Sequence, residues 1–200
     1  MDAPLWIWPA LALAIGYLLG SIPFGLVLTR LFGAGDLRAI GSGSIGATNV
    51  LRTGRKDLAA ATTLLDIAKG TVAVLIAGQL GTGFALLGGV GAFLGHCYPI
   101  WLRFNGGKGV ATMMGISVAL GWQIGLGFAI VWLTVLAATR ISSVGGIAAA
   151  ISAPIIAFWM DESAIGVMLL ALALLVLWKH RANIGRLRAG TEPRIGAKSV

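Results

Sequence analysis

The chain has 200 residues, with 15 Lys and Arg against 7 Asp and Glu, so its formal net charge is +8. Apolar residues make up 58% of the chain and charged residues 11%, against roughly 25% charged residues in soluble domains. These values exclude soluble, disordered and collagen-like chains, and they predict an all-α protein that crosses a membrane several times.

The apolar segments are long enough to be membrane helices, which need about 20 residues. The first covers about residues 5–31, and Pro9 and Pro23 are expected to bend it. The following apolar segments cover about 58–80, 84–102, 110–139, 143–159 and 163–179.

The segment 110–139 is either one long tilted helix or two short helices. The polar stretches that hold fourteen of the fifteen basic residues are 30–57, 103–109, 140–142 and 179–200. The positive-inside rule places such stretches in the cytoplasm. All four share one side only if 110–139 crosses twice, with a turn near Gly121. We therefore expect seven spans, the N-terminus outside and the C-terminus in the cytoplasm. The half before Gly121 is short and is expected to start within the membrane.

The first polar stretch contains a segment suited to binding an anion. Residues 41–52 hold three glycines, three hydroxyl residues, one amide and one arginine. Glycines let backbone N–H groups converge on an anion, and arginine binds phosphate through two parallel hydrogen bonds. A flexible turn between helices would have a similar composition, so both interpretations stand at this point. The candidate ligand-binding residues are Ser42, Gly43, Thr48, Asn49 and Arg52.

A second glycine-rich turn, Gly106-Gly107-Lys108-Gly109, leads into an apolar helix. It is not a nucleotide-binding Walker motif, because no Ser or Thr directly follows Lys108. The amides and positive dipole end of the following helix, which includes Thr112, favour an anion there. Two such loops on the same face make a phosphorylated ligand much more plausible than one.

The segment after the last span also carries polar residues. If the helix continues, His180 and Asn183 share a face at the membrane boundary. A basic anchor for anionic lipid explains the arginines of this segment, but it does not explain His180, Asn183 or Glu192.

Two charged residues, Asp66 and Lys69, lie inside the second predicted span. Charges at that depth are costly, so we expect them to pair and to face the protein interior. The pair serves either as a structural element or as a polar wall of the site. His96, near the end of the third span, is interpreted as a packed hydrogen-bonding residue. No Cys/His cluster has zinc-site spacing, and neither a metal nor another cofactor is expected.

The order and spacing of these motifs resemble those of the bacterial acyl-phosphate:glycerol-3-phosphate acyltransferases. Members of that family usually have Asn where Ser44 stands, often Pro where Ile45 stands, and commonly Glu where Ala182 stands. The matching segments, which together cover essentially the whole chain, are 20–25, 41–52, 66–70, 95–112 and 180–196.

The resemblance implies one integral-membrane domain over residues 1–200, in the bacterial inner membrane, with seven spans and a cytoplasmic active site. It implies transfer of a fatty acyl group from acyl phosphate to the 1-hydroxyl of glycerol 3-phosphate, the first acylation of phospholipid synthesis. The general base stays open between His180, Ser42 and a substrate phosphate. The expected catalytic residues are Ser42, Arg52, Lys108, His180 and Asn183. The expected substrate- and phosphate-binding residues are Gly43, Thr48, Asn49, Gly106, Gly107, Gly109 and Thr112.

A phosphate-ester transporter is the alternative from another functional class. Transporters place their binding groups near the bilayer midplane, often in paired repeats, whereas the polar groups of this chain cluster on one face. Nucleic-acid binding is not expected, because no helix-turn-helix, zinc-finger or RNA-binding signature is present.

Overall fold

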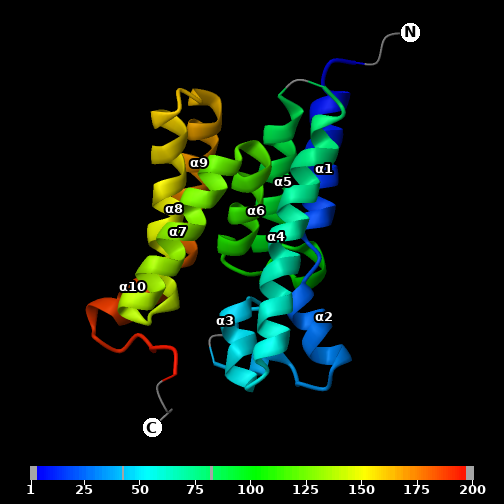
Figure 1. Cartoon of the computed structure of the whole chain (residues 1–200). Helices are drawn as coiled ribbons and strands as arrows, with labels where there is room; N and C mark the ends of the chain where they lie inside the picture. Colours follow the sequence, from blue (N-terminus) through cyan, green and yellow to red (C-terminus); the bar gives the residue numbers. More distant parts are fainter. Residues whose placement is uncertain (1–3, 42, 82, 197–200) are drawn as a thin grey trace. The chain divides into compact units, whose positions relative to one another are not determined.

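The computed structural model describes residues 4–41, 43–81 and 83–196, and all regular secondary structure in these residues is helical (Figure 1). The chain forms two compact units, which divide between Leu120 and Gly121. Unit 1 contains the α-helices α1 (Ile7–Gly20), α2 (Phe24–Leu31), α3 (Ala47–Val50), α4 (Lys56–Gly78), α5 (Phe84–Cys97) and α6 (Val110–Leu120). It also contains the 3₁₀ turns η1 (Leu37–Ala39), η2 (Leu51–Thr53) and η3 (Ile100–Leu102). Unit 2 contains α7 (Trp122–Thr139), α8 (Ser142–Trp159), α9 (Ser163–Lys179) and α10 (Arg181–Arg188).

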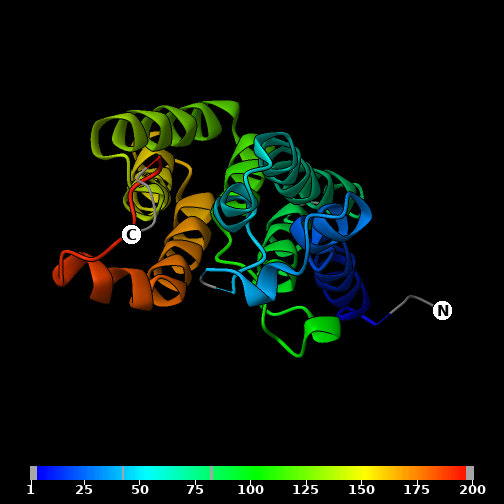
Figure 2. The same ribbon diagram turned by 90° about the horizontal axis from the view of Figure 1, so that it is seen from below.

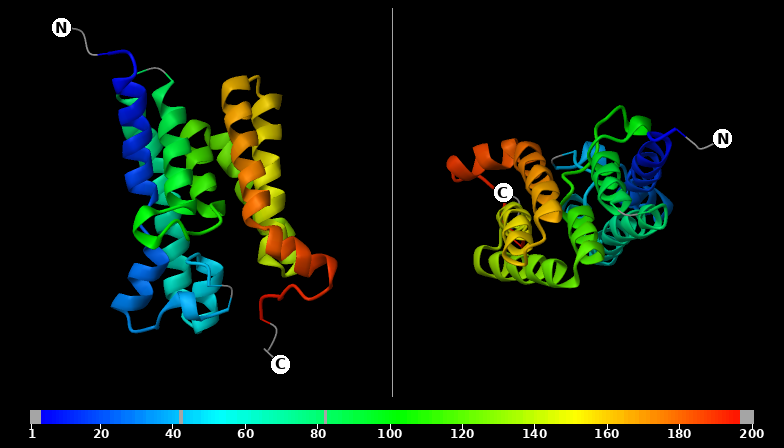
Figure 3. Two further views of the ribbon diagram at one scale, coloured as in Figure 1. Left: turned by 180° about the vertical axis from the view of Figure 1, so that it is seen from behind. Right: turned by 90° about the horizontal axis from the view of Figure 1, so that it is seen from above.

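Helices α1, α4, α5 and α6 form the body of unit 1. Helix α5 packs against α1 and α4, and α4 in turn packs against α6 (Figures 2 and 3). Small residues bring the backbones together, since a Cβ atom at Gly20 would overlap with the carbonyl oxygen of Ala92, and one at Gly115 with that of Ile67. Helices in a membrane associate through such close backbone packing, because lipid tails are as apolar as the side chains themselves.

The predicted bend in the first span is a break between α1 and α2 at residues 21–23. Pro23 supplies no backbone N–H there and clashes with a continuing helix. The expectation for Pro9 is wrong. Helix α1 begins at Ile7, so Pro9 lies in the first turn, where backbone N–H groups have no partner within the helix.

A small apolar core holds the polar end of unit 1 together. Leu26 of α2, Leu37 of η1, Val50 of α3 and Leu58 of α4 are buried against one another, together with Ile45. In Figure 1 α2 and α3 lie beside the start of α4. The segment between the first two spans is therefore a folded structure and not a flexible turn.

Unit 2 is a helical hairpin extended by a third helix. Helix α8 packs against both α7 and α9, and α10 turns away from α9 by 58°. The tail returns to the start of α8, where the amide of Ile195 donates to the carbonyl of Arg140 at 2.7 Å. The tail and the α7–α8 turn are thereby joined.

The described helices fit a multi-pass membrane protein. Five helical stretches are long and apolar enough to cross a membrane, and the bent pair of α9 and α10 is a sixth candidate. The break expected near Gly121 is present between α6 and α7. Helix α6, with 11 residues, is shorter than a full span. The seven-span count and the single-domain division stay predictions.

Replacing Gly115 by Ala is expected to lower the stability of unit 1, because the new methyl group has no room against α4. Overpacking of this kind costs about 1–3 kcal/mol. Thermal unfolding of the purified protein in detergent measures the effect. The matched control is Gly78→Ala, where the nearest atom is 3.6 Å from the new Cβ. Equal unfolding midpoints for the two variants would contradict the close-packing account.

Candidate active site

Asn49 organises the first glycine-rich loop from within. Its side chain is 2% exposed, and its amide nitrogen donates to three backbone carbonyls at 2.8–3.0 Å. The acceptors are Leu37, Ile40 and Ser44. Asn49 therefore shapes the loop, and only its carbonyl oxygen is left to act on a neighbouring group. Ser42, the predicted catalytic hydroxyl, lies outside the described residues.

Arg52 lies over the start of the same loop. Its guanidinium donates to the side-chain oxygen of Asn49 at 3.4 Å. Gly41 has a φ of +55°, and a Cβ atom there would collide with the Arg52 guanidinium. Only glycine both adopts this backbone conformation easily and leaves room for the arginine. Arg52 and Thr48 are exposed, so both can reach a ligand in solution.

The second loop is closed by the end of α5. The amide of Gly107 donates to the carbonyl of His96 at 3.0 Å, and that of Gly106 to the carbonyl of Cys97 at 3.2 Å. Both amides thus close the turn and are not left over for an anion. The anion-binding capacity of this loop rests on the Lys108 side chain and on the first amides of α6.

The two other predicted residues of this loop are buried. A Cβ atom at Gly109 would overlap with the ring of Phe93, so Gly109 lets the turn lie directly on α5. Thr112 is fully buried, and its hydroxyl has no hydrogen-bond partner within the described residues. Its carbonyl lies against Gly70 of α4. Gly109 and Thr112 therefore position the turn through packing.

A buried ionic cluster supports the second loop from below. Lys69 lies 2.7 Å from Asp66, and the two residues are 5% and 3% exposed. Lys69 also donates to the carbonyl of Ile22 at 2.8 Å, in the break between α1 and α2. Nδ1 of His96 lies 3.7 Å from Asp66, and a Cβ atom at Gly107 would collide with Nε2 of the same ring. Asp66 and Lys69 thus belong to the framework that carries the turn.

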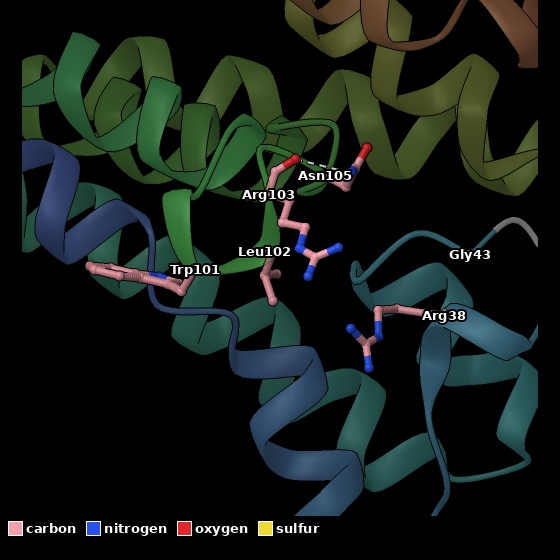
Figure 4. Close-up of a pocket in the computed structure, with 6 residues that line it drawn as sticks. All are labelled: Arg38, Gly43, Trp101, Leu102, Arg103 and Asn105. Carbon is pink, nitrogen blue, oxygen red and sulfur yellow. Dashed lines mark hydrogen bonds between the residues drawn. The ribbon is translucent and has the colours of Figure 1, made fainter.

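The first glycine-rich loop and the segment just before the second one border an open pocket of about 530 Å³ (Figure 4). The guanidinium groups of Arg38 and Arg103 both extend toward the space between the loops. Sequence reasoning used these arginines only to orient the chain in the membrane. Their positions beside two glycine motifs were the signal that could have marked them as binding residues. The lining residues are Arg38, Gly43, Trp101, Leu102, Arg103 and Asn105.

Arg38 is held in place by Asp36. Its guanidinium donates to Oδ1 at 3.0 Å and to Oδ2 at 2.6 Å, and the backbone amide of Arg38 also donates to Oδ1, at 3.0 Å. These hydrogen bonds lower the pKa of Asp36 well below its usual range. Asp36 is therefore ionised at neutral pH and fixes the direction of Arg38.

In unit 2, His180 lies at the start of α10 and Asn183 lies within this helix, and both are buried. Nδ1 of His180 is 2.8 Å from the carbonyl of Val176, and because a carbonyl only accepts, Nδ1 carries the hydrogen. Nε2 is then the basic nitrogen of the neutral ring. The side-chain amide of Asn183 donates to Glu192.

Glu192 joins the tail to α8 and to α10. Besides Asn183, it accepts hydrogen bonds from Ser143 of α8 and Arg186 of α10, both at 2.7 Å. Burial by itself raises the pKa of the Glu192 carboxyl, but the three hydrogen bonds outweigh it and hold the pKa below its ordinary value. Sequence reasoning noticed Glu192 but gave it no role.

The described site chemistry is that of anion binding and proton transfer. Arginine and lysine side chains on two loops of unit 1 suit phosphate groups, and unit 2 holds a buried histidine with a basic nitrogen. A family model described as Glycerol-3-phosphate acyltransferase matches residues 10–190. The chain belongs to this glycerol-3-phosphate acyltransferase family.

Individual relatives support this family assignment. The glycerol-3-phosphate acyltransferase of Mesorhizobium japonicum is 57% identical over 188 residues, which cover 94% of this chain and 96% of the relative. The crystal structure of PlsY (YgiH), an integral membrane glycerol 3-phosphate acyltransferase, in its glycerol 3-phosphate form is 37% identical, with a TM-score of 0.89. It covers 94% of this chain and 96% of its own.

A second structure of PlsY, in its lysophosphatidic acid form, is 36% identical, with a TM-score of 0.87 over 94% of this chain and 95% of its own. The sequence prediction that the chain is an integral-membrane enzyme of this acyltransferase class is confirmed. The individual site residues stay predictions.

Replacing Glu192 by Gln is expected to destabilise the acyltransferase by about 1–3 kcal/mol at neutral pH, because hydrogen bonds to a charged carboxylate are lost. Since the pKa of Glu192 is lowered on folding, its contribution is fully present above the ordinary value of 4.5 and is lost as pH falls through the lower folded value. Unfolding midpoints of the two proteins should therefore converge below pH 4.5. Glu162→Gln, at an exposed turn residue, is the control and should show no such convergence.

Proposed function

We propose that the protein transfers a fatty acyl group from acyl phosphate to the 1-hydroxyl of sn-glycerol 3-phosphate. The hydroxyl oxygen attacks the acyl carbonyl carbon, and the bond from that carbon to the phosphate oxygen breaks. Inorganic phosphate leaves with the bonding electrons, and the hydroxyl proton passes to a base. The lipid product is 1-acyl-sn-glycerol 3-phosphate, or lysophosphatidate.

One observation carries this proposal. A basic pocket of unit 1 is lined by Gly43 of the first glycine-rich loop and by residues 101–103 and 105, just before the second loop, and both proposed substrates carry phosphate. The forms in which the PlsY structures were solved, with glycerol 3-phosphate and with lysophosphatidic acid, fit the same acceptor and product. Acyl phosphate as the donor rests on the sequence resemblance.

The residue roles follow from charge and position. Arg52 and Lys108 are proposed to bind the phosphate groups, and a cation near the leaving phosphate stabilises the charge that it gains. Thr48 is proposed to add a hydrogen bond from its exposed loop position. Gly43, Gly106, Gly107 and Gly109 are proposed to shape the two loops around the ligand.

The proton acceptor is proposed among three groups, namely His180, Ser42 and a substrate phosphate. Imidazole is a common base near neutral pH, Nε2 is the ring nitrogen of His180 without the hydrogen, and Asn183 is proposed to assist it. Acyl phosphate is a mixed anhydride with a good leaving group, so direct transfer needs mainly positioning and charge stabilisation. We therefore propose transfer without an acyl-enzyme, and recovery of an acyl ester on Ser42 would contradict it.

We also propose that the chain crosses the bacterial inner membrane seven times, with its C-terminus and active site in the cytoplasm. Helix α6 counts as a short span that starts within the membrane. A fluorescent protein that matures only in the cytoplasm, fused after Val200, is expected to be fluorescent. Alkaline phosphatase, which is active only outside the cytoplasm, is expected to be inactive at the same position. The reverse pattern would support a single tilted helix over 110–139.

The activity is tested with purified protein, palmitoyl phosphate and glycerol 3-phosphate. Phosphate release and lysophosphatidate formation are expected to match one to one, with no product from palmitoyl-CoA. Lys108→Gln is expected to lower kcat/KM by about 100-fold or more, since a charge that stabilises the transition state is lost. Lys56→Gln, an exposed change at the start of α4, is the control and should retain activity.

Two outcomes would contradict the proposal. Equal use of palmitoyl-CoA would show that the donor is wrongly assigned. Uptake of labelled glycerol 3-phosphate into sealed vesicles without acylation would favour the transporter alternative.

A further inference from the structure

The pocket has two apolar lining residues, Trp101 and Leu102, at the end of a candidate membrane-spanning stretch. Ile100 and Trp101, 56% and 54% exposed, lie at the end of the candidate span Phe84–Leu102, and Phe104, 57% exposed, comes just after it. The indole N–H of Trp101 donates to the carbonyl of Ser21 at 2.8 Å, which fixes the ring. Tryptophan is favoured at the level of lipid headgroups, because its ring is apolar and its N–H is polar. The pocket is therefore expected to open at the membrane surface.

The charges of this pocket favour the binding of an anion. Asp36 directs and balances the guanidinium of Arg38. The Arg103 guanidinium has no hydrogen bond or ion pair with the described part of the chain. One positive charge at the pocket is thus left without a carboxylate, and its planar fork matches the geometry of a phosphate group.

The backbone that positions Arg103 has an unfavourable conformation. Arg103 and Phe104 have φ values of 51° and 62°, a conformation that side-chain-bearing residues rarely adopt. The amide of Phe104 donates to the carbonyl of Pro99 at 3.0 Å, and the Asn105 side chain donates to the carbonyl of Arg103 at 3.0 Å (Figure 4). The loop thus places a cation in the pocket wall directly before an exposed apolar residue in the chain.

We propose that this pocket docks the singly substituted phosphate head of a fatty amphiphile, with Arg103 and Arg38 on the phosphate and the chain leaving past Trp101 and Phe104. Its volume of about 530 Å³ is within the usual range of small-ligand sites. Neither Lys108 nor Arg52 is among its lining residues, so Arg103 and Arg38 add two cations to the phosphate-binding residues proposed above. Both the acyl-phosphate donor and the lysophosphatidate product have this chemistry. The choice between them rests on the proposed function.

The kinetic test uses Arg103→Asn, because asparagine tolerates the left-handed backbone but carries no charge. KM for palmitoyl phosphate is expected to rise about tenfold or more, as for the loss of one charge-assisted hydrogen bond, while KM for glycerol 3-phosphate changes less than about twofold. Arg103→Lys should restore most of the affinity. Lys56→Gln is the matched control for loss of one exposed charge from unit 1 and should leave both values unchanged.

A binding test distinguishes the acyl-phosphate donor from the lysophosphatidate product as the ligand, and it does not require catalytic turnover. Labelled lysophosphatidate is bound to the wild type and to Arg103→Asn in detergent, with three competitors: a non-hydrolysable acyl phosphonate, inorganic phosphate and phosphatidylglycerol. If the phosphonate displaces labelled lysophosphatidate, the pocket is a donor site. If the phosphonate does not displace it, the pocket is a product site. Absence of product with wild-type enzyme would contradict the proposed function, and the binding test would still decide the docking proposal.

Three results would overturn the docking proposal. The first is an unchanged KM for palmitoyl phosphate together with unchanged lysophosphatidate binding in Arg103→Asn. The second is an equal rise in both KM values with a lowered unfolding midpoint, which would make Arg103 a structural residue. The third is equally effective competition by phosphatidylglycerol, which would make the pocket a general contact for membrane lipid.

Discussion

The buried ion pair between Lys69 and Asp66 connects the parts on which the rest of unit 1 depends. Unpaired charges inside a membrane are costly, so the two residues stay together and hold their neighbours in place. Lys69 also binds the carbonyl of Ile22, where Pro23 interrupts the first span. Asp66 lies beside His96, and the carbonyl of His96 receives the amide of Gly107. One ionic interaction thus links the break in the first span to the second glycine-rich loop.

Glycine serves two different physical purposes in this chain. In the spans it lets helices approach at backbone distance, as Gly115 does against α4. In the loops it leaves room for neighbouring side chains, as Gly41 does for Arg52 and Gly107 for His96. Because both purposes exclude a Cβ atom, most substitutions at these positions would disturb either the packing of the helices or the shape of the site.

Much of the fold could be predicted from the sequence, because apolar length and the distribution of charge reflect the membrane directly. The helical class follows from composition, the break near Gly121 from the distribution of basic residues, and the pairing of Asp66 with Lys69 from their spacing. The exact helix ends do not, which is why Pro9 was wrongly expected to bend α1. The site was predicted by residue type, but the uses of Asn49 and of the Gly106 and Gly107 amides were not, since their partners are distant in the sequence or lie in another element.

The sequence by itself determined that this is a helical membrane protein with two glycine-rich anion loops, and its motifs identified the acyltransferase family. Only the tertiary structure decided that Arg38 and Arg103 share a pocket, and that Glu192 connects the tail to α8 and α10. The physical reason is that composition and periodicity record how each segment meets lipid or water. Which side chains meet one another depends on how the helices pack, and no local pattern specifies that packing.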